Sequence, residues 1–335
     1  GWVWIFTSWI TNWLDPEALP IRLGLFVLMV AGLLLSSSIP QAFGERGLLF
    51  AGAYVFMQVG RTAYSLWAVR GEPLNMTRNF QRILLWLMFS GVFWITGGLL
   101  EGPQRLACWG LALAIEVLSP SLYFWVPGLG RSTLEDWNVE GNHMAERCAL
   151  FVIIALGESL LVTGATFAEL ATSAEGVLAF VVAVLGSIAM WWVYFDSGAE
   201  RAHHRIAHSS DPGRQARIAY TYLHVLIVAG IIVSAVADEL VLVHPQHASQ
   251  AAVLVIVGGP WLFLLGCALF KWVMNERPLP PLSHLAGLAA LLLLLPAAWN
   301  QWFSALALGS LTTLVMLLVA AWETLALRER AASRQ

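Results

Sequence analysis

Long apolar runs, separated by short segments rich in Pro, Gly and charged residues, follow one another along the whole chain. A helix needs about 20 apolar residues to cross the ~30 Å hydrocarbon core of a bilayer, and most of these runs reach that length. They are too long for the strands of an outer-membrane barrel, which alternate in segments of about 10 residues. The pattern therefore predicts an all-α fold, a polytopic transmembrane helical bundle. Eleven spans are expected, at 1–14, 20–42, 47–69, 79–100, 104–126, 144–167, 175–196, 217–241, 250–274, 281–298 and 302–325.

The first of these runs is incomplete. It is too short for a full crossing, and it begins at Gly1 without the basic segment of a signal peptide. We therefore expect a further helix ahead of Gly1, which would bring the bundle to twelve spans.

The composition agrees with a lipid environment. Only 12% of the 335 residues are charged, whereas 59% are hydrophobic. Soluble domains contain about 25% charged residues. The balance excludes an ordinary soluble enzyme, a disordered chain and a nucleic-acid partner. The three cysteines lie inside apolar runs, where they are typical of small buried side chains rather than of a disulfide framework or a metal cluster. No cofactor is expected.

The basic residues are distributed unevenly between the two sides of the predicted bundle. Fifteen of the eighteen fall in one alternating set of connections together with the C-terminal tail, two fall in the other set, and Arg61 lies inside the third run. Connections on the cytoplasmic side of a membrane carry the excess of Lys and Arg. The asymmetry predicts a multi-pass protein with a cytoplasmic C-terminus.

Two segments that lie six spans apart resemble each other. Leu28–Ser36 reads LMVAGLLLS and Leu226–Ser234 reads LIVAGIIVS. An even number of spans between the copies predicts a parallel repeat of two six-helix halves, an arrangement known in transporters. Chance similarity between Leu- and Gly-rich helices is the alternative. The expected segments are a first half at 1–127, a cytoplasmic connection at 128–142, a second half at 143–327 and a cytoplasmic tail at 328–335.

Ionisable residues inside a span are the candidates for chemistry, because each costs about 2.5–3.5 kcal/mol to insert. Glu158 follows Gly157 deep in the sixth run, and an acid at that depth is either a proton-relay group or half of an ion pair, for example with Arg61. Glu116 precedes Pro120, which either opens a cavity or only bends the helix. His224 is most simply a packing histidine with a satisfied ring.

Two polar groups are expected at the cytoplasmic side. His143, Glu146 and Arg147 share one helix face, where they form either a capped helix start or an entrance to a path toward Glu158. The connection 197–217 contains His203, His204 and His208, whose spacing allows a metal but favours a loop that meets lipid headgroups.

Several stretches carry a resemblance to one known family, the bacterial low temperature requirement A family. The stretch His143–Ser159 resembles its signature most closely. The chain resembles the family throughout, in Trp2-Val3-Trp4 with Thr7, Asp15 and Arg22, in Ala53 to Arg61 and in Trp191–Phe195. Members usually begin with a helix carrying a Glu-Leu-Phe-Phe-Asp-Leu type motif, which is absent here. The resemblance implies a protein of the bacterial inner membrane, and the family name implies no molecular activity.

The leading functional hypothesis is a secondary transporter or permease with a buried, proton-linked site between the two halves, which uses Glu158 with Glu116 and Arg61 as candidate partners. Its expected partners are membrane lipids and a small solute or ion, and a homo-oligomer is compatible with the sequence. The alternatives are a membrane-embedded enzyme acting on lipid-linked substrates and a non-catalytic scaffold that interacts with lipid. A non-enzymatic function is expected over an enzymatic one, and the sequence contains no phosphate loop, nucleophile elbow or zinc motif.

Overall fold

The computed structural model describes residues 2–11, 18–70, 74–133, 141–170, 173–196, 217–275 and 279–332. Within these ranges the chain is helical and forms no strand, apart from an isolated bridge between Val126 and Gly130. It divides into two compact units, an N-terminal unit (Trp2–Val139) and a C-terminal unit (Glu140–Gln335), and each is described by itself.

The N-terminal unit contains short and long helices around one polar interior. Its elements are α1 (Trp2–Thr11), α2 (Leu19–Ser38), the 3-10 turn η1 (Ile39–Gln41), α3 (Gly47–Val55), the π-helical η2 (Phe56–Gly60), α4 (Arg61–Ala68), α5 (Leu74–Leu99) and α6 (Gly102–Ser121). Helix α3 packs on α2 and α5, and α5 packs on α6. Pro20 lies in the first turn of α2, where its missing N–H costs nothing.

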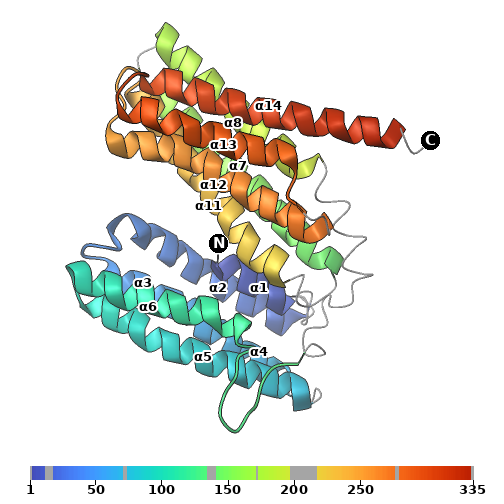
Figure 1. Ribbon diagram of the computed structural model, residues 1–335. Coiled ribbons are helices and arrows are strands. Elements are labelled where there is room, and N and C mark those ends of the chain that lie inside the picture. The colour runs from blue at the N-terminus through green and yellow to red at the C-terminus, as the bar shows by residue number, and fades with distance from the viewer. Residues whose placement is uncertain are drawn as a thin grey trace. The chain divides into compact units, whose positions relative to one another are not determined.

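The C-terminal unit is a bundle of longer helices (Figure 1). Its elements are α7 (Gly141–Glu169), α8 (Ala174–Phe195), the π-helical η4 (Arg217–Leu223), α11 (His224–Val243), α12 (Gln250–Asn275), α13 (Leu282–Trp299) and α14 (Ala305–Ala332). Helices α12, α13 and α14 lie side by side, and α14 also packs on α8. Helix α14 continues to Ala332, so most of the tail expected at 328–335 is helical.

Eight helices of the described chain are long and apolar enough to cross a membrane. The runs expected at 1–14, 47–69 and 104–126 also form helices, but they are not among the eight. Helix α1 has 10 residues, which span only about 15 Å. The run 47–69 is interrupted by the π-helical turn, and α6 carries two buried charged residues, Arg105 and Glu116.

Three basic residues that were counted with the connections are buried inside helices. Arg82, Arg105 and Lys271 lie near the ends of the runs expected at 79–100, 104–126 and 250–274, and the structure places them in α5, α6 and α12. Arg105 donates to the carbonyl oxygens of Ala42 at 2.9 Å, Gly44 at 2.7 Å, Gly97 at 3.2 Å and Leu100 at 2.8 Å. These bonds join the α2–α3 turn to α5 and α6. The N–H donors of the buried guanidinium therefore find their acceptors in the protein rather than in water.

The segment after α6 folds back along α5. Helix α6 ends at Ser121, and Tyr123 and Phe124 adopt positive φ angles of 53° and 47°, which turn the chain. The Arg82 Nε then donates to Leu129 O at 2.9 Å, and Trp86 Nε1 donates to Trp125 O at 3.1 Å. The expected span 104–126 therefore ends as a helix before its last residues.

Helices α11 and α12 approach closely because glycines form their interface. A Cβ added at Gly230 would overlap the backbone of Phe263, and one at Gly259 would lie 2.7 Å from the backbone nitrogen of Ser234. Small residues at membrane interfaces allow helix backbones to come together in this way.

Candidate functional site

Glu116 is a buried carboxylate surrounded by hydrogen-bond donors at the centre of the N-terminal unit. Its side chain is 2% exposed. Oε2 accepts from Tyr54 Oη at 2.6 Å and from Gln58 Nε2 at 3.3 Å. Oε1 accepts from Ser90 Oγ at 2.9 Å and from Trp94 Nε1 at 2.8 Å. Donors from α3, η2 and α5 thus converge on one acid of α6, and such charge-assisted hydrogen bonds are the strong ones.

Gln58 links this carboxylate to Arg61. Its amide nitrogen donates to Glu116, and its amide oxygen accepts from an Arg61 guanidinium nitrogen at 2.6 Å. The other terminal nitrogen of Arg61 donates to Thr7 Oγ1 at 3.2 Å and to Val3 O at 3.3 Å, both on α1. The acid and the base are therefore joined through an amide. Within the described ranges, no carboxylate lies within 4 Å of the Arg61 guanidinium.

The π-helical turn η2 places these side chains. Tyr54, Gln58 and Arg61 follow one another along one face of the third apolar run. The Thr62 hydroxyl donates to Gln58 O at 2.8 Å, and the Ser65 hydroxyl donates to Arg61 O at 2.9 Å. Hydroxyls that bond back to the preceding turn compete with the regular helical pattern. Single π-helical turns are often found at functional sites.

Arg61 also borders a cavity of about 520 Å³ between α2 and the η2–α4 segment. Its walls are mostly aliphatic and aromatic. Arg61 is 3% exposed, and among the described residues its Nε has no hydrogen-bond partner. The chain Glu116–Gln58–Arg61 therefore runs from the interior of the unit to the wall of a cavity.

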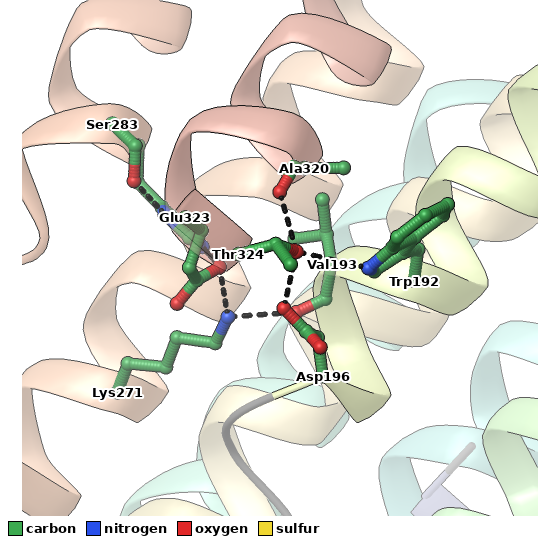
Figure 2. A network of polar contacts seen from close by, with 9 residues as sticks. Trp192, Val193, Asp196, Lys271, Ser283, Ala320, Glu323 and Thr324 are labelled. Carbon is green, nitrogen blue, oxygen red and sulfur yellow. Dashed lines mark hydrogen bonds and ion pairs between the residues drawn. The ribbon is translucent and has the colours of Figure 1, made fainter. Parts of the chain in front are cut away.

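The C-terminal unit contains a second buried ionic group, shown in Figure 2. Lys271 on α12 is 2% exposed, and its Nζ lies 2.6 Å from Glu323 Oε2 on α14 and 2.7 Å from Val193 O on α8. His284 at the start of α13 brings Nε2 to 3.8 Å from the same carboxylate oxygen, and its Nδ1 lies 3.2 Å from Ser283 Oγ. The group joins four helices of the unit.

An exposed hydrogen-bonded set lies beside this ion pair. The Thr324 hydroxyl is within hydrogen-bond distance of Asp196 Oδ2 and of Ala320 O, and it accepts from Trp192 Nε1 at 3.1 Å. These contacts hold the last turn of α8 against α14.

His224 lies at the junction of η4 and α11 and is buried. Its Nδ1 is 2.8 Å from Ala219 O, and its Nε2 is 2.8 Å from Tyr194 Oη. Because a carbonyl only accepts, Nδ1 carries the proton, and in the neutral ring Nε2 accepts from the tyrosine. Both ring nitrogens are satisfied inside the protein.

The structure places Glu158 differently from the expected deep burial, because its side chain is exposed on α7. Glu116 and Arg61 belong to one network of the N-terminal unit, whereas Glu158 and His224 belong to the C-terminal unit. Glu146 is exposed and Arg147 is half-buried in the first turns of α7. The side chain of His143 lies outside the described residues, and so do His203, His204 and His208.

Sequence reasoning missed most partners of the buried acids. The missed residues are Tyr54, Gln58, Ser90 and Trp94 around Glu116, and Lys271 and Glu323 in the C-terminal unit. The sequence did contain a signal for Glu323. Like Glu116, it is an ionisable residue inside an expected span, here 302–325. The helical spacing of Tyr54, Gln58 and Arg61 was a signal for the face that carries them.

Comparison with known proteins gives one family and one relative. A family model described as "Bacterial low temperature requirement A protein (LtrA)" matches residues 1–321. The chain is 42% identical over 334 residues to "Uncharacterized protein RA0937" of Rhizobium meliloti (strain 1021), covering 98% of this chain and 79% of that protein. No solved structure matches the chain.

Proposed function

The chain belongs to the bacterial low temperature requirement A family, and for this member we propose the function of a secondary transporter or permease. In this proposal a small solute crosses the membrane together with a proton, and Glu116 is the residue that exchanges the proton. The observation that carries the proposal is the chain of side chains from Glu116 through Gln58 to Arg61 at the cavity wall.

The surroundings of Glu116 suit an acid that changes its protonation state. The Ser90 hydroxyl has a second acceptor, Leu87 O at 3.1 Å, besides Glu116. When Glu116 gains a proton, Ser90 can turn its own proton to Leu87 O and accept from the acid instead. The Tyr54 hydroxyl accepts from the Gln58 amide nitrogen at 3.4 Å and continues to donate to Oε2 of the acid. Both protonation states then keep their hydrogen bonds.

The two units resemble each other in where their buried acid and its partners lie, and this resemblance supports the same proposal. In the N-terminal unit a carboxylate of the last helix, Glu116, receives contacts from α3–η2 and α5. In the C-terminal unit Glu323 of the last helix contacts Lys271 of α12 and lies near His284 of α13. The two helices before the last one thus contribute the partners in both units. We take this as support for a parallel repeat of transporter type.

We also propose that Glu158 lies along the path of the solute. A carboxylate on the outer surface of an apolar helix needs water or a polar partner, because lipid solvates it poorly. Residues His143, Glu146 and Arg147 are proposed as the entrance at the start of the same helix, on the cytoplasmic side.

The proposal is tested by uptake into proteoliposomes under an inward proton gradient. The panel of labelled solutes includes monocarboxylates, dicarboxylates, amino acids, sugars and amines. We expect uptake of one class above that of empty vesicles, and its loss when a protonophore removes the gradient. Glu116→Gln is expected to lose the gradient-driven part, because the amide cannot exchange a proton.

Glu101→Gln is the matched control, since Glu101 is exposed just before the same helix. It is expected to keep the uptake of the native protein. Gradient-driven uptake that survives in well-folded Glu116→Gln would contradict the role of Glu116. A panel in which no solute exceeds empty vesicles would contradict transport.

A further inference from the structure

We propose that the cavity beside Arg61 binds an amphipathic organic anion, with its carboxylate on the guanidinium and its apolar part along the cavity wall. The inference rests on the proposed function, because the bound anion would be the transported solute. It commits to a free organic anion as the occupant rather than a phospholipid.

Arg61 carries a buried positive charge at the wall of the cavity. A buried cation without an opposite charge is costly, whereas a bound anion would offset that cost. The guanidinium lies 3.2 Å from Thr7 Oγ1 and 2.6 Å from Gln58 Oε1, which are neutral acceptors, and within the described chain no carboxylate approaches it within 4 Å. A Phe6 ring centroid lies 5.5 Å from its central carbon. Among the described residues, Glu116 reaches the guanidinium only through the Gln58 amide, so the cation makes no direct contact with an anion there.

The polar groups that line the cavity offer one unused donor. Tyr64 Oη donates to Pro20 O at 2.6 Å, Ser65 Oγ donates to Arg61 O at 2.9 Å, and Thr7 Oγ1 donates to Val3 O at 2.9 Å. Their hydroxyl protons are thus engaged inside the protein. Within the part of the chain that the structure describes, the Arg61 Nε–H has no hydrogen-bond partner, and Arg61 lines this wall. A carboxylate oxygen is the acceptor that suits a guanidinium N–H best.

The shape of the cavity is the second argument. Its volume of about 520 Å³ falls in the range of sites that hold a small organic molecule. The rest of the wall is apolar, from Leu19, Leu23, Val27, Leu28 and Phe56 among others. Such a wall would leave a sugar or an inorganic ion poorly solvated, whereas it suits a hydrocarbon or aromatic body.

The depth of Arg61 favours a free anion over a phospholipid. The Tyr64–Pro20 contact places the middle of α4 beside the start of α2. Arg61 is the first residue of α4 and lies about 10 Å from its C-terminal end, at 1.5 Å per residue to Ala68. A phospholipid keeps its phosphate in the headgroup region, outside the hydrocarbon core. A single carboxylate carried on a compact apolar body reaches the guanidinium more readily.

Binding is tested by equilibrium dialysis of tritiated 2-naphthoate against the full chain in phosphatidylcholine nanodiscs. Empty nanodiscs correct for partition into lipid. The neutral 2-naphthylmethanol and the cationic 2-naphthylmethylamine have the same body without the negative charge. We expect naphthoate to bind saturably and the two analogues to bind about tenfold more weakly or not at all, since a charge-assisted bond is lost.

Arg61→Gln is expected to weaken naphthoate binding about tenfold or more. Arg105→Gln is the matched control, because Arg105 is another buried arginine of this unit whose donors all go to carbonyl groups away from the cavity. It is expected to bind as the native protein does. Leu28→Trp fills the cavity without touching the charge, so it gives a second test if Arg61→Gln does not fold.

Equal binding of naphthoate and naphthylmethanol, or unchanged binding in both Arg61→Gln and Leu28→Trp, would overturn the inference. So would retention of phosphatidylglycerol by the native protein, lost in Arg61→Gln, without naphthoate binding, because the occupant would then be a lipid. Dialysis requires no transport. Binding without Glu116-dependent uptake would reject the transport proposal alone, and uptake of another solute without naphthoate binding would reject this inference alone.

Discussion

Lys271 is the single lysine of the chain, and it is buried, so its charge has to be balanced inside the protein rather than by water. Two charges taken out of water together are tolerated when they pair and when hydrogen bonds satisfy the remaining positions. Lys271 meets both conditions, with Glu323 as its counter-ion and Val193 O as a further acceptor. At the residue scale, the Lys271–Glu323 pair balances its two charges within the C-terminal unit.

Removing one member of that pair should be costly. Lys271→Met leaves Glu323 buried without its counter-ion, and we expect a loss of about 3–5 kcal/mol in the free energy of unfolding. The measurement is reversible unfolding by SDS titration in mixed micelles. The double variant Lys271→Met/Glu323→Leu should recover most of the loss, because no uncompensated charge remains.

Gln246→Ala is the comparison for a surface contact. Gln246 Nε2 donates to the exposed Glu175 at 2.6 Å, and the loss of this bond should change unfolding by less than about 1 kcal/mol. An effect of Lys271→Met no larger than that of Gln246→Ala would show that the buried pair does not stabilise the unit.

The sequence predicted some residues of the buried networks, for a definite reason. Glu116, Arg61 and His224 were found because a charge or an imidazole inside an apolar run stands out by itself. Tyr54 and Trp94 did not stand out, because aromatic residues are common in membrane helices and their role appears only when α3, α5 and α6 pack together. The exposure of Glu158 could not be predicted from the sequence either, because apolar residues surround α7 and mark no single buried face.

At the scale of elements, the helices could be predicted and their irregularities could not. Apolar length located the helices of both units with errors mainly at their ends. The π-helical turns η2 and η4 have no signal in hydropathy, and at η2 the Thr62 hydroxyl donates to the Gln58 carbonyl oxygen of the preceding turn. The fold-back after α6 depends on backbone angles at Tyr123 and Phe124 that these residue types rarely adopt.

The α11–α12 interface gives a prediction with a control in the next residue. An alanine at Gly259 would place Cβ 2.6 Å from Ser234 Oγ and 2.7 Å from the Ser234 backbone nitrogen, whereas Gly258 has no atom within 4 Å. We expect Gly259→Ala to destabilise the protein by about 1–3 kcal/mol, as overpacking does. Gly258→Ala should be neutral or slightly stabilising, because alanine favours helix.

Thermal unfolding of the two variants in the same detergent is the measurement. Equal melting temperatures for Gly258→Ala and Gly259→Ala would mean that the helices do not approach as closely as described.

At the scale of the whole molecule, the distribution of charge predicts the orientation in the membrane. The excess of basic residues in one set of connections predicts that the C-terminus and the connection 197–217 both face the cytoplasm. Green fluorescent protein fused after Gln335 should fluoresce, and alkaline phosphatase at the same place should be inactive. Active phosphatase at the C-terminus would indicate the opposite orientation, and the proposed entrance at Glu146 and Arg147 would then lie on the other side of the membrane.

Proton exchange at Glu116 can be followed through the lumenal pH of proteoliposomes. Proteoliposomes of the native protein and of Glu116→Gln carry a pH-sensitive dye inside, with the membrane potential clamped by potassium and valinomycin. When the transported solute is added outside, the account predicts that the lumen acidifies with the native protein and keeps its pH with Glu116→Gln and with empty vesicles. Solute uptake by the native protein with no change of lumenal pH, or acidification that is the same in Glu116→Gln, would contradict it.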